Sequence, residues 1–445
     1  MAGFEEEEIE DLSARAKGVV VGFVKEREKH PNADKLSVCQ VDVGSEEPIQ
    51  IVCGAKNVRA GLHVPVAMVG AELPAVNLTI KAGELRGVSS NGMICSLSEL
   101  GLATESDGIA ELDALTDELP ALGAPVAPML GLDDTVLELA ITANRPDGLS
   151  MVGIAREVAA LTGAALSLPD LTLEPAHELL QASAASAEAM QAGGLYGITL
   201  IEGVDGSQVS PTWVQQRLER AGINRVNAVV DITNVVMLEQ GQPLHAFDAD
   251  ALEQLTGKPV NAASFGLRQA REGEAFIGLD DRELSLDSRA QVVTCHDLPI
   301  ALAGVMGSKA SGVTAATGRI WLESAMFSPA AVRTTARSVG LRTDASARFE
   351  KGLPKEMTLA CSIRALELLK ELFPCEAKGL WVCGDSAADA GSVLLRRDAL
   401  HQLLGPLEDE EGSSDLADAV IEQCLTALGC ELSPSDEGWH VIAPP

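Results

Sequence analysis

The stretch Gly18-Val19-Val20-Val21-Gly22-Phe23-Val24, followed by His30-Pro31-Asn32-Ala33-Asp34-Lys35, decides how the first part of the chain folds. The first segment is a short apolar run rich in β-branched residues, which favour strands. The second is rich in residues that favour turns. Further strand-like segments follow at residues 36–43, 49–54, 63–69 and 78–81. Short strands separated by turn signals at close spacing predict a small β-barrel or sandwich.

Outward from this stretch, helical patterns mix with strands. Ser150 is placed to cap a helix whose apolar residues have helical spacing, and Gly163 is placed to end it. Further helices are expected at 213–221, 227–239 and 359–373, and strands at 292–295 and 300–304. Beyond these, an apolar stripe over 416–428 predicts a helix that Gly429 ends, and 439–442 predicts a strand.

These changes predict an α+β multidomain chain. We expect the remnant of an N-terminal domain at 1–15, a β-barrel at 16–120, the remainder of the N-terminal α+β domain at 121–165, a linker at 166–194, a mixed α/β domain at 195–385 and an α+β domain at 391–445. One helix and one strand bury little apolar surface by themselves, so the last domain is expected to be cut short.

Composition narrows the class of protein. Of the 445 residues, 46% are hydrophobic and 22% are charged, which indicates a folded globular chain. No apolar run reaches the roughly 20 residues that cross a bilayer, and the first residues lack the features of a signal peptide. The nine cysteines are widely spaced without a C-x-x-C pair, which favours reduced thiols in a cytoplasmic protein over a zinc site or disulfides. We expect no membrane partner and no metal site.

The charge is distributed unevenly. A net charge of −32 disfavours loose binding to nucleic acid, because phosphates would be repelled. Residues 17–104 are an exception, with nine Lys and Arg against nine Asp and Glu, which leaves that window neutral. If any part of the chain contacts RNA, the first hundred residues are the candidate.

Two groups of motifs then become specific. The first group lies in the predicted barrel: His30-Pro31-Asn32-Ala33-Asp34-Lys35-Leu36, Cys53-Gly54-Ala55, Asn57-Val58-Arg59-Ala60-Gly61 and Gly92-Met93-Ile94-Cys95-Ser96. The second lies in the 195–385 domain: Val230-Asp231-Ile232-Thr233-Asn234, Gly241-Gln242-Pro243-Leu244-His245, Ala301-Leu302-Ala303-Gly304-Val305-Met306-Gly307, Trp321-Leu322-Glu323-Ser324 and Gly340-Leu341-Arg342-Thr343-Asp344-Ala345-Ser346. In this order they resemble the β subunit of bacterial-type phenylalanine–tRNA ligase, as an N-terminal portion truncated at both ends.

For the barrel, the resemblance implies an OB-fold that binds tRNA. OB-folds hold nucleic acid on one strand face and the neighbouring loops. The candidate phosphate contacts are Lys35, Lys56, Arg59 and Arg86, and the alternative for each is an ordinary solvated charge. Phe23 is the only aromatic residue in the 17–104 window, so base stacking is not extensive.

For residues 195–385, the resemblance implies an editing domain that hydrolyses tyrosine from tRNA(Phe). An apolar pocket rejects an isostere that only adds a hydroxyl by roughly 100-fold, so a second site must bind that hydroxyl. Glu323 holds this position, and His245 with Thr233 and Asn234 matches positions near the ester. The expected walls are small: Ala303, Gly304, Thr343 and Ala345. We expect direct attack by water, assisted by the hydroxyls of the substrate.

Several alternatives stay open. His245 taken alone is a structural histidine, and Glu323 taken alone is a partner in a salt bridge at a strand end. Val235 and Ser308 depart from the family pattern, so a tRNA-binding subunit with a silent pocket is the second hypothesis, and a free-standing deacylase is the third. The resemblance also implies an α subunit as partner in an α2β2 tetramer, a C-terminal domain of truncated winged-helix-like form, no cofactor within this chain, and ATP and Mg²⁺ for the complete ligase.

Overall fold

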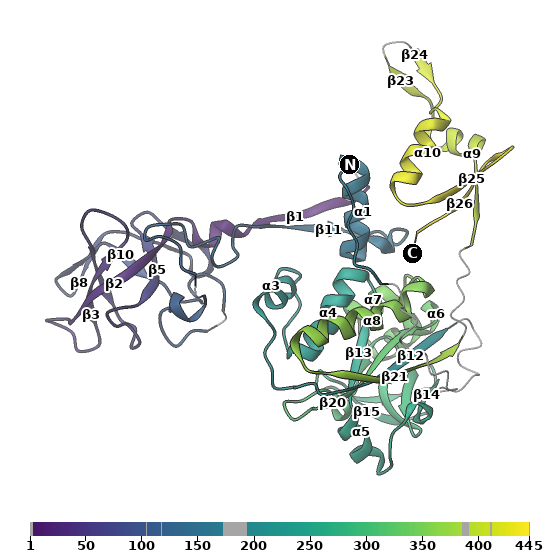
Figure 1. The fold of residues 1–445 in the computed structure, drawn as a ribbon, viewed down its shortest axis with the longest axis horizontal. Coiled ribbons are helices and arrows are strands. Elements are labelled where there is room, and N and C mark those ends of the chain that lie inside the picture. Colours follow the sequence, from purple (N-terminus) through teal and green to yellow (C-terminus); the bar gives the residue numbers. More distant parts are fainter. Residues whose placement is uncertain are drawn as a thin grey trace. The chain divides into compact units, whose positions relative to one another are not determined.

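The computed structural model describes residues 3–103, 105–116, 118–171, 194–384, 391–409 and 412–444. It divides into two compact units, Glu5–Ala140 and Met1–Phe4 with Ile141–Pro445. Figure 1 shows the helices and strands of both. Most of the predicted linker at 166–194 lies outside the described residues, as do 385–390 between the two later predicted domains.

The first unit contains a five-stranded antiparallel sheet in the order β10-β5-β2-β3-β4. Its strands are β2 (Val19–Lys29), β3 (Ser37–Asp42), β4 (Ile49–Cys53), β5 (His63–Met68) and β10 (Gly92–Ile94). The backbone N–H of Asn91 donates to the Gln50 carbonyl, and that of Val52 donates to the Ser90 hydroxyl, so the two edges of the sheet approach each other. The sheet is therefore nearly closed, and the predicted small barrel is confirmed.

Short elements surround this barrel. They are β1 (Glu5–Asp11), η1 (Leu12–Ala16), β6 (Glu72–Leu73), η2 (Pro74–Val76), β7 (Leu78–Thr79), β8 (Gly83–Leu85), β9 (Val88–Ser90), η3 (Leu112–Ala114) and β11 (Thr135–Ala140). β1 pairs with β11, and the backbone at 124–126 hydrogen-bonds to β2. The compact unit therefore extends on both sides of the 16–120 segment that the sequence indicated.

The second unit is organised around an antiparallel sheet in the order β13-β20-β12-β21. Its strands are β12 (Leu195–Glu202), β13 (Leu244–Asp248), β20 (Arg319–Met326) and β21 (Glu376–Gly384). Two helices, α4 (Ala228–Gln240) and α8 (Lys355–Leu372), lie along one face of it (Figure 1). Because strand side chains alternate between faces, Leu322 packs into the core under these helices and Trp321 into a separate core on the other face.

A second sheet, in the order β14-β17-β18-β19, contributes to the core that contains Trp321. Its strands are β14 (Phe265–Gln269), β17 (Gln291–Cys295), β18 (Leu298–Leu302) and β19 (Met306–Gly307). The other elements between 195 and 384 are α3 (Thr212–Arg220), α5 (Ala249–Thr256), η5 (Ala262–Ser264), β15 (Glu274–Ile277), β16 (Glu283–Leu286), η6 (Lys309–Ser311), α6 (Pro329–Val339) and α7 (Asp344–Phe349).

Local capping explains where two helices begin and end. α1 (Met151–Thr162) follows the short η4 (Pro146–Leu149). The Ser150 hydroxyl accepts from the Gly153 N–H, and Gly163 closes the helix in the left-handed conformation. α4 begins in the same way at Asn227, whose side chain accepts from the Val230 N–H. The helices that the sequence predicted after Ser150 and at 227–239 are confirmed.

The segment after residue 391 contains a three-stranded sheet and two helices. Its elements are β22 (Val393–Arg396), α9 (Arg397–Leu404), β23 (Leu407–Asp409), β24 (Gly412–Ser414), α10 (Asp418–Ala427), β25 (Glu431–Ser435) and β26 (Gly438–Ile442). The helix expected over 416–428 and ended by Gly429 is present as α10; Ile421 is its only buried residue among those described, while Val420 and Cys424 are exposed. None of the described helices has the length and apolarity that a membrane crossing requires.

Candidate functional site

The two residues expected to carry the chemistry lie opposite each other on neighbouring strands. His245 of β13 pairs with Glu323 of β20, and Glu323 also pairs with Ile198 of β12. Directly paired residues project from the same face of a sheet, so all three share the face turned away from α4 and α8. Trp321 and Trp381 share that face, with ring centroids 5.5 Å apart. The expected pair is thus brought together in an aromatic environment.

Glu323 is a buried carboxyl group, 7% exposed. Burial raises its pKa to about 7, and the nearby Tyr196 O–H lowers that pKa in turn. Its Oε2 atom has no hydrogen-bond partner among the described residues. A buried acceptor without a donor is costly, so this atom suits a donor that arrives with a ligand. The alternative role of Glu323 as a salt-bridge partner is not seen among the described residues, and no cation is among the groups that shift its pKa.

His245 is half-buried, and its Nε2 atom is fully buried without a partner among the described residues. Its ring stands edge-on to Phe247, with centroids 4.6 Å apart. Burial lowers the pKa of His245 to about 4. The imidazole is therefore neutral near pH 7, where it can donate one hydrogen bond and accept another, but it is a weak base. This favours orienting a water or hydroxyl group over removing a proton completely.

Two glycines of the 303–307 segment lie in tightly packed positions, and Gly307 is beside His245. A Cβ on Gly307 would stand 2.5 Å from Nε2 of His245, closer than side-chain atoms approach. Gly304 has a φ of +68°, and a Cβ there would stand 2.9 Å from Val332 and 3.0 Å from Phe349. Both glycines therefore allow close packing that a larger residue would prevent. Ala303, the neighbouring expected wall residue, is fully buried in the same core as Trp321.

The other two expected wall residues lie at the start of α7. The Thr343 hydroxyl caps this helix by accepting from the Ser346 N–H, and it donates to the Val305 carbonyl at 2.9 Å. Ala345 packs against the core that contains Ala303. The hydroxyl of Thr343 thus fixes the 303–307 segment to α7.

Thr233 and Asn234 occupy a different position. Both lie on α4, whose apolar residues pack into the core on the opposite face of the sheet. The Thr233 hydroxyl donates to the Val230 carbonyl within its own helix. Among the described residues, no hydrogen bond joins either side chain to His245 or Glu323. Their expected position near the ester stays a prediction.

Two residues at the site were missed by sequence reasoning. Tyr196 of β12 places a buried phenol beside Glu323. Gln242 is buried before β13, and its amide donates to the Ala325 carbonyl at 2.9 Å, which anchors the entry to β13 on β20. The available signals were weak: Tyr196 is the only tyrosine in the chain, and Gln242 lies three residues before His245 in a quoted motif.

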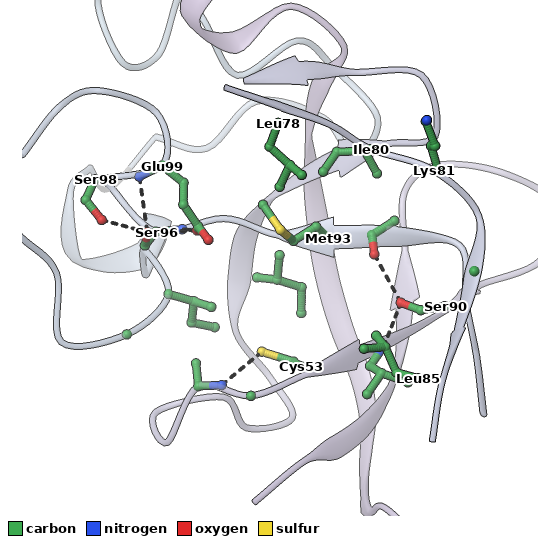
Figure 2. A pocket seen from close by; sticks show the side chains of 18 of the residues that line it. Cys53, Leu78, Ile80, Lys81, Leu85, Ser90, Met93, Ser96, Ser98 and Glu99 are labelled. Atoms are coloured by element: carbon green, nitrogen blue, oxygen red, sulfur yellow. Dashed lines mark hydrogen bonds between the residues drawn. The ribbon is translucent and has the colours of Figure 1, made fainter. Parts of the chain in front are cut away.

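The barrel has a cavity of its own, with a volume of about 760 Å³. It lies between β4, β10 and the segment around β7 and β8 (Figure 2). Ser96, Ser98 and Glu99 gather at one end of the view and Lys81 at the other. Glu99 accepts from the Ser96 hydroxyl at 2.8 Å and from the Ser96 N–H. The cavity therefore combines apolar walls with a few fixed polar groups.

The four expected phosphate contacts fall into two pairs at the barrel. His30 and Asn32 hydrogen-bond to the Leu85 and Arg86 carbonyls, which brings the loop that carries Lys35 to Arg86. Asn57 hydrogen-bonds to the backbone of Ile109, so the loop with Lys56 and Arg59 is fixed there. All four side chains are exposed, but Arg59 donates to both oxygens of Glu111 at 2.8 and 2.9 Å. Its charge is thus partly neutralised.

Metal ligation is a separate question. Within the described ranges, no three His, Cys, Asp or Glu side chains lie close enough together to hold a metal ion.

Comparison with known proteins adds independent evidence. Residues 192–374 match the family model described as "B3/4 domain", and residues 19–118 match the one described as "Putative tRNA binding domain". The chain is 96% identical over 445 residues to a phenylalanine–tRNA ligase β subunit from Parasynechococcus marenigrum (strain WH8102), covering all of this chain and 55% of that protein. A β subunit from Synechococcus sp. (strain CC9605) is 70% identical, covering all of this chain and 54% of its own length. The chain thus spans about half the length of the curated relatives it matches.

Proposed function

Because the chain belongs to the family of phenylalanine–tRNA ligase β subunits, we propose that it binds tRNA(Phe) and hydrolyses tyrosine wrongly attached to it. The observation that carries this proposal is the pairing of buried Glu323, whose Oε2 lacks a partner among the described residues, with half-buried His245.

The sheet face around Glu323 suits a phenol. An apolar site built for phenylalanine discriminates weakly against tyrosine, whereas a site with a buried hydrogen-bonding group favours the substrate that satisfies it. The hydroxyl of tyrosine would donate to Oε2 of Glu323. Phenylalanine would leave that atom unpaired at a cost of about 1–3 kcal/mol. The site therefore prefers tyrosine over phenylalanine, the reverse of the preference of a site that attaches phenylalanine to tRNA.

The reaction is ester hydrolysis by water. The water oxygen attacks the ester carbonyl carbon, the bond to the terminal ribose oxygen breaks, and that oxygen takes up a proton to leave a free tRNA end and free tyrosine. Neutral His245 orients the water or the ribose through its ring nitrogens, since its pKa of about 4 makes it a poor general base. The hydroxyls of the ribose assist the proton transfer. Thr233 and Asn234 are assigned to the tRNA end.

The barrel supplies the contact to tRNA in this proposal. Lys35 and Arg86, on loops tied by hydrogen bonds, would contact phosphates, with Lys56 and Arg59 as a second pair. In the complete protein, an α subunit in an α2β2 tetramer would use ATP and Mg²⁺ to charge tRNA(Phe) in the cytoplasm, and this chain would edit the product.

The test compares two substrates. The chain is incubated with Tyr-tRNA(Phe) and with Phe-tRNA(Phe), and the release of each amino acid is followed. We expect faster release of tyrosine, and its loss in Glu323→Ala and in His245→Ala. If both variants deacylate at the parent rate, the assignment of the site is wrong.

A silent pocket is the second candidate, and one observation favours it. The Tyr196 phenol lies beside Glu323, where it resembles an internal occupant of the position given to the substrate. Under this hypothesis the chain binds tRNA and supports assembly, and Tyr-tRNA(Phe) stays intact after incubation with the folded chain.

A further inference from the structure

Tyr196 shares the buried sheet face of Glu323, and the reaction proposed above does not use it. It lies on β12, is 1% exposed and pairs with Ala325 of β20. Because Ile198 is the residue directly opposite Glu323, Tyr196 occupies the diagonal position on the same face. An aromatic side chain reaches across a strand pair from that position.

The two facing groups have complementary chemistry. The Tyr196 phenol oxygen and Glu323 Oε2 are both buried, and neither completes a hydrogen bond among the described residues. Burial raises the pKa of Tyr196 well above its usual value of 10, and the Glu323 carboxyl group raises it further. The phenol therefore keeps its proton and acts only as a donor toward a carboxylate.

We propose that Tyr196 is a positioning residue for substrate recognition: its O–H donates to one oxygen of Glu323 and leaves the other oxygen facing the substrate phenol. This inference rests on the proposed function. A carboxylate accepts at two oxygens, so the phenols of Tyr196 and of the substrate can donate to it together. Two donors satisfy the buried charge better than one, and Phe-tRNA(Phe) brings no second donor.

The groups that face this pair titrate in separate pH ranges. His245 of β13 faces Glu323, and burial lowers its pKa to about 4. Cys295 of β17 acts on Tyr196, and burial raises its pKa to about 11. A change near pH 7 at the Tyr196 ring therefore reports on Glu323, whose pKa burial raises to about 7.

The first experiment observes the contact directly, without enzyme activity. Because the chain contains one tyrosine, tyrosine labelled with ¹³C at Cζ gives one resonance, which belongs to Tyr196. We expect its chemical shift to titrate near pH 7 in the parent chain and to lose that titration in Glu323→Gln. A flat profile in the parent, or an unchanged one in Glu323→Gln, overturns the proposal.

The second experiment measures recognition. In Tyr196→Phe, we expect KM for Tyr-tRNA(Phe) to rise about fivefold, the effect of one lost hydrogen bond, with kcat nearly unchanged. Losing the donor also raises the pKa of Glu323. The carboxylate that accepts from the substrate phenol then forms only at higher pH, so the pH above which KM falls should move upward. Thr199→Val is the matched control, because it removes a buried oxygen from β12 on the opposite face, and we expect parent KM and parent pH dependence.

The outcomes separate this inference from the proposed function. If Glu323→Gln loses selectivity for tyrosine while Tyr196→Phe matches the parent in KM and pH profile, the function stands and the role of Tyr196 is overturned. If Tyr196→Phe deacylates faster than the parent, the phenol blocks the site and the role is overturned in favour of the silent pocket. If the parent does not deacylate although its Tyr196 resonance titrates near pH 7, the proposed function fails and the contact is structural only.

Discussion

The imidazole of His245 lies directly beside Gly307, so that a Cβ on residue 307 would stand 2.5 Å from Nε2. The clash is with a ring held by Phe247, not with the end of a flexible side chain. We predict that Gly307→Ala displaces the imidazole and lowers the deacylation rate by about 10- to 100-fold, because small displacements of positioned groups are costly. Overpacking should also reduce the free energy of unfolding by about 1–3 kcal/mol.

A matched glycine controls for the substitution itself. Gly318 is in the same unit, and a Cβ there would meet nothing closer than the Val204 carbonyl at 4.0 Å. Gly318→Ala should keep parent activity and stability in the deacylation assay and in urea unfolding. Equal rates for Gly307→Ala and the parent would show that the ring of His245 does not need its observed position.

The pH dependence of stability offers a test that needs no substrate. Between pH 4.5 and 7, unfolded Glu323 has lost its proton and the folded group retains it, so stability falls as pH rises. The change from 4.5 to about 7 in the pKa corresponds to about 3 kcal/mol at most. We predict that Glu323→Gln gains stability relative to the parent as pH rises through this range, measured by urea unfolding at several pH values. A constant difference would mean that burial does not raise the pKa of Glu323.

His245 should show the opposite slope. Between pH 4 and 6.5 the unfolded imidazole binds a proton and the folded one does not, so stability rises with pH. We predict that His245→Asn loses stability relative to the parent over this range, by about 3 kcal/mol at most, since His245 is half-buried and solvent screens part of the effect. In the parent the two effects oppose each other. The two single variants measured against the parent should therefore diverge in opposite directions, and parallel profiles would contradict the prediction.

The structure shows why some features were predictable from sequence. Caps act within a few residues, so Ser150, Gly163 and Asn227 located two helices without reference to the rest of the fold. The short strands of the barrel were equally local. The apolar stripe after 416 predicted its helix correctly, but such spacing does not say what covers a helix, and Val420 and Cys424 are exposed.

The site itself depends on pairings that are distant in sequence. The residues between His245 and Glu323 in the sequence form two further sheets, and only the register of β13 against β20 places the two side chains opposite each other. A shift of one residue would turn Glu323 toward α4 and α8. The motifs of the family supplied the residues, but not this register, and no motif pointed to Tyr196. Thr233 is the opposite case. A motif pointed to it as a site residue, but its hydroxyl donates a hydrogen bond within its own helix.

Thr343 should couple helix capping to the wall of the site. Its hydroxyl accepts from the Ser346 N–H and donates to the Val305 carbonyl. We predict that Thr343→Val, which keeps the shape but removes the hydroxyl, costs about 1–2 kcal/mol of stability and slows deacylation, because 303–307 loses its anchor. Thr343→Ser retains both hydrogen bonds and should recover most of each effect. Failure of serine to restore activity would place the role of Thr343 in its methyl group instead.

The basic residues of the barrel should differ in their contribution to tRNA binding. Among the described residues, Lys35 and Arg86 form no ion pair, whereas both oxygens of Glu111 already engage Arg59. A free cation releases a counterion from the tRNA on binding, and a paired one must first leave its carboxylate. We predict that the slope of log K against log salt becomes smaller in magnitude by about two in the double variant Lys35→Ala with Arg86→Ala, and by well under one in Arg59→Ala.

Fluorescence anisotropy with tRNA(Phe) between 50 and 200 mM salt, conditions in which such slopes are large, measures both. An equal loss from Arg59→Ala would show that tRNA displaces Glu111, and an unchanged slope in the double variant would remove Lys35 and Arg86 from the contact surface.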